Sequence, residues 1–295
     1  MRLDRLLTLC LFRPIQPSDD YRLPILMYHS VSVERQEGVG SYYRTVTNPD
    51  VFARHMALLK SEGYLGVTLS TGLNVLNRGV YRGAKLIVIT FDDGFRDFHT
   101  AAFPILQQHG FGATVFLPTA FIGDERQQFK SRECMTWSEV RELHRAGVEF
   151  GSHTVNHPRL VDLDWLDIER ELCDSRREIE VRLETTTRTF AYPFAFPQGD
   201  KRFANRFRQL LCKTGYESCV TTEIGRTRPG DDRLRLCRLP ANSDDDDRLL
   251  SAKLAGGYDW VAVPQAMSKA IRCRLRPYRR YSNSHEDTFA MRLQA

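Results

Sequence analysis

The chain has 295 residues, of which 42% are hydrophobic and 27% are charged, so it can bury one large core in a single domain. The net charge of +5 is modest and the arginines are dispersed, which is not typical of nucleic-acid binding, and we expect no nucleic-acid partner. The seven cysteines include no C-x-x-C pair, so neither a disulfide framework nor a cysteine zinc site is indicated.

The two ends of the chain differ in composition from its middle. At the N-terminus, Asp4 interrupts the basic stretch before a short apolar run at residues 6–12, and no small-x-small cleavage site follows. We therefore expect no cleaved signal peptide and a cytoplasmic location, which also fits free thiols. The predicted organisation is an N-terminal tail over 1–20, expected to be loosely held, a catalytic domain over 21–265 and a basic C-terminal tail over 266–295. That last segment is a solvated tail or a docking patch for an acidic polymer or membrane surface, and membrane association and oligomeric state stay open.

Strand and helix patterns alternate through the middle of the chain. Strands are predicted at 24–28, 86–89, 113–117, 148–150 and 189–192, and helices from 48–50 onward and at 97–109, 138–146 and 164–183. This alternation favours a parallel sheet, in which reactive groups gather at the carboxyl ends of the strands.

Two carboxylates follow the apolar strand at 86–89. Side chains alternate between the faces of a strand, so Asp92 and Asp93 can reach one site only if the chain leaves strand geometry there, and Gly94 permits such a departure. A carboxylate bound to a metal stays ionised while its neighbour accepts a proton from water. Asp-Asp-Gly is also a common turn sequence, so this segment alone is weak evidence.

Two imidazoles follow the strand at 148–150. His153 and His157 are four positions apart, and imidazole is a good ligand for zinc. Gly151 and Pro158 disfavour a helix here, so a loop at a strand end is predicted. Together with the carboxylates, this pair predicts a metal-dependent hydrolase.

The segments 90–94 and 153–157 resemble the first two motifs of the polysaccharide deacetylase family, carbohydrate esterase family 4, which contains the NodB homology domain. The resemblance spans about residues 24–260 and implies an α/β fold, a distorted (β/α) barrel with fewer than eight regular units. It also implies that Asp92 is the general base and that Asp93, His153 and His157 bind the metal, usually zinc, with cobalt or nickel as alternatives. Residues 190–195 resemble the third motif, in which the Phe194 N–H would help to hold the oxyanion and Tyr192 would lie at the substrate.

Two positions depart from the family pattern. Ala191 stands where many members have an arginine that orients the base, so Arg96 or a water is expected to tune Asp92. The C-terminal Leu-x-His motif is also missing. His29 is predicted to be the general acid, because it ends the first strand on the same rim, and residues 27–30 resemble the branch that includes the poly-N-acetylglucosamine deacetylases. His55, His99, His109 and His144 fall in predicted helices, where surface or packing roles suit them better.

The predicted function is metal-dependent removal of N-acetyl groups from amino sugars of a poly- or oligosaccharide, with that N-acetylated carbohydrate as the partner. Three alternatives remain: an iron site for oxygen chemistry, a barrel that binds polysaccharide without cleaving it, and a hydrolase of another amide or ester. Tyr192, Phe194 and Phe196 could stack on sugar rings, but core packing explains aromatic residues as often.

Overall fold

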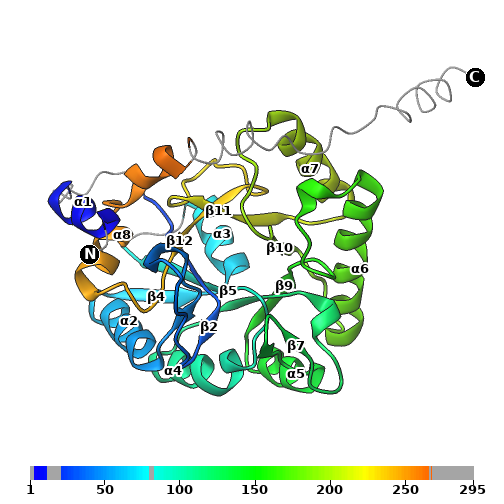
Figure 1. Cartoon of the computed structure of the whole chain (residues 1–295), viewed down its shortest axis with the longest axis horizontal. Coiled ribbons are helices and arrows are strands. Elements are labelled where there is room, and N and C mark those ends of the chain that lie inside the picture. Colours follow the sequence, from blue (N-terminus) through cyan, green and yellow to red (C-terminus); the bar gives the residue numbers. More distant parts are fainter. Residues whose placement is uncertain (1–2, 12–20, 80–82, 266, 268–295) are drawn as a thin grey trace, which may run out of the picture.

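A computed structural model describes residues 3–11, 21–79, 83–265 and 267 (Figure 1). Its strands are β1 Ile25–Tyr28, β2 Ser30–Val31, β3 Val46–Thr47, β4 Tyr64–Val67, β5 Lys85–Phe91, β6 Thr114–Leu117, β7 Gln128–Phe129, β8 Arg132–Glu133, β9 Glu149–Ser152, β10 Thr189–Ala191, β11 Ser218–Ile224 and β12 Leu236–Pro240. Its α-helices are α1 Leu3–Leu11, α2 Pro49–Ser61, α3 Leu69–Arg78, α4 Phe103–His109, α5 Trp137–Arg145, α6 Trp165–Leu183, α7 Lys201–Lys213 and α8 Asp247–Leu254.

The main sheet is parallel and closes on itself. Its eight strands follow the order β1-β12-β11-β10-β9-β6-β5-β4, and β1 also pairs with β5 in the register Ile25↔Val88 to Tyr28↔Phe91. Because β4 lies outside this closure and pairs with the amino half of β5, seven of the eight strands form the ring. The fold is therefore the predicted distorted (β/α) barrel with fewer than eight regular units.

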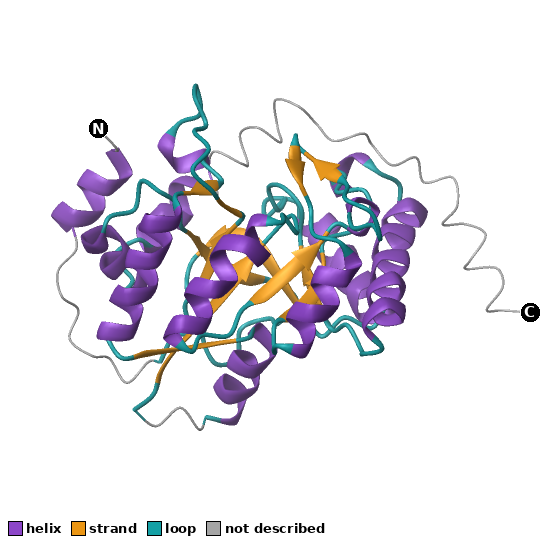
Figure 2. Cartoon of the chain, turned by 90° about the horizontal axis from the view of Figure 1, so that it is seen from below, coloured by secondary structure: helices purple, strands orange, loops and turns teal. Residues whose placement is uncertain are grey.

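Helices surround the barrel, and one of them packs against its interior. Figure 2 shows helices outside the central strands, and Figure 1 shows α3 in the middle of the view down the barrel. Leu69, Leu73 and Leu76 of α3 share a core cluster with Leu23 and Leu86, which lie at the amino ends of β1 and β5. This packing fills the amino end of the barrel and leaves the carboxyl ends of the strands for the site.

The helix boundaries follow from local capping. Asn48 caps α2 by accepting from the Asp50 N–H, and Pro49 occupies the first turn, where its missing N–H costs nothing. Thr136 and Glu139 form a reciprocal capping box at the start of α5. Asp246 caps α8 by accepting from the Leu249 N–H.

The N-terminal segment differs from the expectation of a loosely held tail. Residues 3–11 form α1, whose Thr8 is fully buried and accepts from the Trp260 indole N–H at 3.1 Å. Tyr258 donates to Asp4 at 2.6 Å, so α1 is attached to the end of the domain. The cause is the apolar face of this short helix, which packs beside α8.

Some predictions fall partly outside the described residues. The described cysteines are free thiols, as expected: Cys10, Cys134, Cys173, Cys212, Cys219 and Cys237. Of the predicted basic tail over 266–295, residues 266 and 268–295, Cys273 among them, lie outside the described residues. No described helix combines the length and apolarity needed to cross a membrane. The limits of the catalytic domain stay a prediction.

Candidate active site

The two carboxylates leave the strand as the sequence predicts. β5 ends at Phe91, and Asp93 and Gly94 then adopt positive φ angles of 73° and 61°. The Asp92 N–H still donates to the Tyr28 carbonyl at 3.1 Å, which fixes the position of the turn against β1. This left-handed step is uncommon for a residue other than glycine, and it turns both carboxylates toward one site.

The two histidines lie in a loop after β9, as predicted. The His153 N–H donates to the Leu117 carbonyl at 2.9 Å, and its Nδ1 lies 2.8 Å from the Ala191 carbonyl. The His157 N–H donates to Thr154 Oγ1 at 2.9 Å. Since the Ala191 carbonyl can only accept, Nδ1 carries the proton and Nε2 keeps its lone pair.

Asp93, His153 and His157 come together as a buried three-ligand cluster. Their ligand atoms all lie within 4.8 Å of one another, and Asp93 Oδ1 is 3.3 Å from His157 Nε2 and 3.7 Å from His153 Nε2. A tetrahedral zinc with bonds of about 2.0–2.1 Å needs neighbouring ligand atoms roughly 3.3 Å apart. Among the described residues, Asp93 Oδ1 has no hydrogen-bond partner, although it is buried. The cluster therefore fits a divalent metal.

The protonation states also suit metal ligands. Burial lowers the pKa of His153 and lowers that of His157 to about 3, so both imidazoles are neutral near pH 7. For Asp93, burial would raise the pKa, but electrostatic interactions, first with His29 and then with the Lys130 ammonium group, outweigh it and lower the pKa. An ionised carboxylate and two neutral imidazoles are the forms that bind zinc.

Asp92 is held by an arginine that the sequence analysis missed. Nη1 and Nη2 of Arg238, in β12, donate to Oδ1 and Oδ2 of Asp92, both at 2.7 Å. The two side chains are 0% and 3% exposed. Burial would raise the pKa of Asp92, but the charge and hydrogen bonds of Arg238, with His153 and His29, hold it well below its usual range. The expectation for Arg96 is wrong, because Arg96 pairs with Glu133 at 2.9 Å and lies 3.5 Å from Glu139.

His29 lies at the candidate site, whereas His55 has a packing role in the core. His29 follows β1, and its Nε2 lies 4.0 Å from Asp92 Oδ2 at the same cavity as the metal ligands. Burial lowers the pKa of His29, while Asp92 and Asp93 act in the opposite direction. His55 is buried in α2 between the Tyr28 hydroxyl and the Asp245 carbonyl, which is the expected packing role.

The segment that resembles the third family motif, with the adjoining Phe196, supplies one exposed aromatic ring. Phe194 is 47% exposed at the cavity, and its ring lies 4.6 Å from the His157 ring. Tyr192 lines the same cavity, but its ring packs edge-on against Phe196 and Phe207 in a core cluster. Phe196 is 2% exposed, so of these three aromatic residues Phe194 is the one with a ring open to a ligand.

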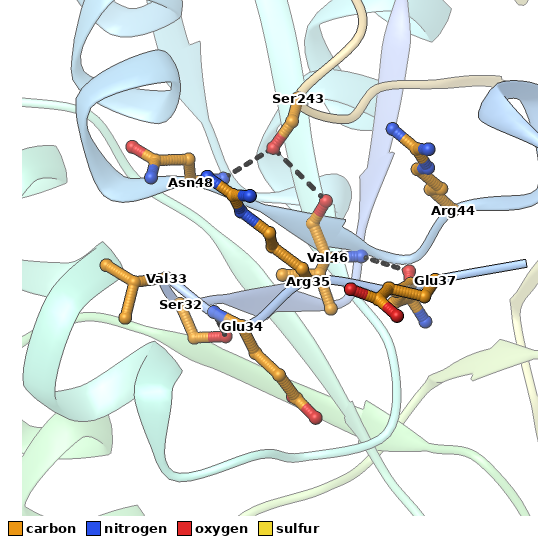
Figure 3. Close-up of a pocket in the computed structure, with 10 residues that line it drawn as sticks. Ser32, Val33, Glu34, Arg35, Glu37, Arg44, Val46, Asn48 and Ser243 are labelled. Carbon is orange, nitrogen blue, oxygen red and sulfur yellow. Dashed lines mark hydrogen bonds between the residues drawn. The ribbon is translucent and has the colours of Figure 1, made fainter. Parts of the chain in front are cut away.

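Two cavities flank the segment around Arg44. The cavity at the candidate site has a volume of about 540 Å³. Its wall includes His29, Asp92, His153 and His157. The second cavity, of 410 Å³, lies among residues 32–37, Val46, Asn48 and Ser243 (Figure 3). Arg44 contributes to both walls and is fixed by a bidentate contact with Asp244 at 3.0 and 3.1 Å.

Comparison with known proteins assigns the chain to a family. The sequence model of a protein family, described as polysaccharide deacetylase, matches residues 79–218. This range contains both Asp92-Asp93 and the histidine pair. YxkH of Bacillus subtilis, whose name places it among polysaccharide deacetylases, is 30% identical over 204 residues, 69% of this chain and 66% of YxkH. The chain belongs to the polysaccharide deacetylase family.

Two further proteins extend the comparison. The poly-β-1,6-N-acetyl-D-glucosamine N-deacetylase of Staphylococcus aureus is 26% identical over 208 residues, 68% of this chain and 69% of that protein. The Streptococcus pyogenes deacetylase PplD, solved with acetate, superimposes with a TM-score of 0.67 at 26% identity over 80% of this chain and 99% of PplD. The chain thus spans about two thirds of the length of these curated relatives and the same barrel as PplD.

Proposed function

We propose that this polysaccharide deacetylase is a metal-dependent hydrolase that removes N-acetyl groups from amino sugars of a poly- or oligosaccharide. The observation that carries the proposal is the orphaned Asp93 Oδ1, which faces two neutral imidazoles beside an arginine-paired second carboxylate. Asp93, His153 and His157 would hold the metal, and their oxygen and nitrogen donors suit zinc best, with cobalt or nickel as substitutes. When bound, the metal supplies Lewis-acid polarisation of the acyl carbonyl and of a water molecule.

Asp92 is proposed as the general base. Its two oxygens each accept one hydrogen bond from Arg238, which leaves a lone pair on each oxygen for the attacking water. The guanidinium also fixes the plane of the carboxylate and keeps it ionised. Asp92 would take the proton from the water as it attacks the acetyl carbon.

His29 is proposed as the general acid, and the Phe194 N–H is proposed as a donor to the oxyanion. His29 Nε2, near Asp92, would donate a proton to the departing amine. The Phe194 N–H would hold the oxyanion, and removal of one such donor typically costs on the order of 100-fold in rate. The C–N bond then breaks to give acetate and a free amino sugar.

The test is acetate release from N-acetylglucosamine oligomers by protein that is chelated and then resupplied with zinc. We expect release to stop with the chelator and to return with zinc. Asp92→Asn should lower turnover by about 100-fold or more while the bound metal per chain stays the same. His109→Gln, at the end of α4, is the matched control and should keep wild-type activity.

The same assay separates the alternatives. Zinc binding without release from any acetylated glycan would favour a polysaccharide-binding barrel. Release from other acylated amides or esters alone would favour a different hydrolase on the same fold. Wild-type turnover in Asp92→Asn would refute the assignment of the base.

A further inference from the structure

A tight hairpin lies beside the candidate metal ligands. β7 and β8 pair antiparallel in the register Gln128↔Glu133 and Phe129↔Arg132, so Lys130 and Ser131 alone form the turn. Both have positive φ angles, 51° and 62°. Two-residue turns of this kind favour asparagine and glycine, so a lysine here adopts an uncommon backbone conformation.

The hairpin is anchored on both sides of this turn. Arg132 donates to Glu34 at 2.6 Å, and its guanidinium lies 5.5 Å from the centre of the Phe95 ring. The Phe129 ring lies 4.4 Å from the Phe121 ring and 5.1 Å from the His157 ring. These contacts fix the position of the turn relative to the metal ligands.

The Lys130 side chain reaches the carboxylate of the cluster. Its Nζ lies 3.0 Å from Asp93 Oδ2, 4.6 Å from the centre of the Phe129 ring and 5.8 Å from that of Phe194. Asp93 therefore has two different oxygens: Oδ2 accepts from an ammonium group, and Oδ1 faces the two imidazoles. A buried cation of the same cavity, Arg238, is already paired with Asp92.

A divalent cation at the cluster would meet this ammonium group directly. It would share the single charge of Asp93 with Lys130, and the two cations would repel each other at short range in a buried site where screening is weak. Because the lysine side chain is 42% exposed, it can swing toward solvent, but it then loses its ion pair. Either outcome reduces the free energy gained on metal binding.

We propose that Lys130 is a positioning residue that acts as an internal counter-cation: it holds the Asp93 carboxylate in the metal-free protein and lowers the affinity of the site for a divalent metal. The inference rests on the metal centre of the proposed function. Through this competition, the hairpin sets how readily the enzyme loads and releases its metal. A purely supporting lysine would have the opposite effect, since its loss would leave Asp93 less well oriented and weaken metal binding.

Isothermal titration of the metal-free full chain with zinc tests the sign of the effect. Lys130→Met keeps the stem over Phe129 and removes the charge, and it should bind zinc about tenfold more tightly than the wild type. Lys130→Arg keeps the charge and should stay within about threefold of the wild type. Lys201→Met, at the exposed start of α7, makes the same change in net charge away from the cavity and should have no effect.

The outcomes separate this inference from the proposed function. Unchanged or weaker zinc binding by Lys130→Met would overturn the inference. Zinc binding that is equally absent from the wild type and from His153→Ala would instead refute the metal centre itself. Far-UV circular dichroism checks that each variant is folded, and Lys130→Gln provides a second neutral variant with the same expected tightening.

Discussion

The buried pair of Asp92 and Arg238 makes a prediction about the pH dependence of the reaction. Arg238→Met would remove the charge and two hydrogen bonds that hold the pKa of Asp92 low, and the burial that remains would raise it. A base with a raised pKa is protonated at higher pH, so the acidic limb of the kcat/KM profile should shift upward. We also expect a loss of stability of about 3–5 kcal/mol, because the variant leaves a buried charge unpaired.

Arg96→Met serves as the control for this variant. Arg96 is the arginine that is closer to Asp92 in sequence, yet its guanidinium pairs with Glu133 at a half-exposed position. Its removal should leave the acidic limb in place and change stability by less than about 1 kcal/mol. A shift of the limb in Arg96→Met but not in Arg238→Met would contradict the assignment.

The residues of the site differ in how far the sequence predicts them. The gathering of Asp92-Asp93 and the histidine pair could be predicted, because both segments follow apolar strands and parallel strands end on one rim. The resemblance to the family then implied Asp93, His153 and His157 as the ligands. Arg238 could not be predicted, since it is 146 residues from Asp92 and the contact depends on the ring order that places β12 beside β1. A charged residue between apolar ones at 236–240 was the available signal, because an arginine is rarely buried without a partner.

At the scale of elements, the loop after β10 combines a ring exposed at the cavity with core packing. Phe194→Ala should raise KM severalfold with a loss of stability below about 1 kcal/mol, because this ring is half exposed at the cavity. Phe196→Ala should destabilise the protein by about 3–5 kcal/mol, because its buried ring packs on Tyr192. Steady-state kinetics and urea unfolding measure both quantities. Equal stability losses in the two variants would contradict this division of roles.

The strands themselves show which patterns predict an element. β5 and β6 are continuous apolar or β-branched runs buried along nearly their whole length, so they were predicted to within two residues. β11 and β12 contain polar residues inside the barrel, among them Thr221 and Arg238, and were not predicted. Those polar side chains are satisfied by partners from other strands, such as the Leu236 carbonyl for Thr221, which a local pattern does not show.

On the scale of the whole molecule, a buried polar network joins three elements behind His29. Lys253 of α8 donates to Asp245 at 2.8 Å, and the Asp245 carbonyl lies 2.7 Å from His55 Nε2 of α2. His55 Nδ1 in turn lies 2.9 Å from the hydroxyl of Tyr28, the last residue of β1. The network therefore supports the strand end from which His29 follows.

Lys253→Met tests how much this network contributes to stability. The variant would leave the Asp245 carboxylate buried without its cation, so we expect a loss of about 3–5 kcal/mol in the free energy of unfolding, measured in urea. Lys60→Met, which removes an exposed lysine at the end of α2, should change it by less than about 0.5 kcal/mol. A loss below 1 kcal/mol in Lys253→Met would show that water reaches this pair.

The lowered histidine pKa values predict how the metal-free protein responds to acid. Burial lowers the pKa of His55, His153 and His157 below the value of about 6.5 that an unfolded chain would have. The unfolded state therefore binds protons first, so stability is complete above about pH 7 and falls as the pH drops, for His157 down to about 3. Each group contributes at most about 1.4 kcal/mol per pH unit within its window.

Urea unfolding with a chelator at pH 7.5, 6.5 and 5.5 measures this loss. His157→Gln removes one of these groups and should give a shallower decline over the same range. Added zinc should stabilise the wild type at pH 7.5, by about 2.7 kcal/mol when free zinc is 100 times the Kd, and less at pH 5.5 because protons compete for the imidazoles. Constant stability between pH 7.5 and 5.5 would mean that water solvates these histidines in the folded protein, and the metal site would then be open rather than buried.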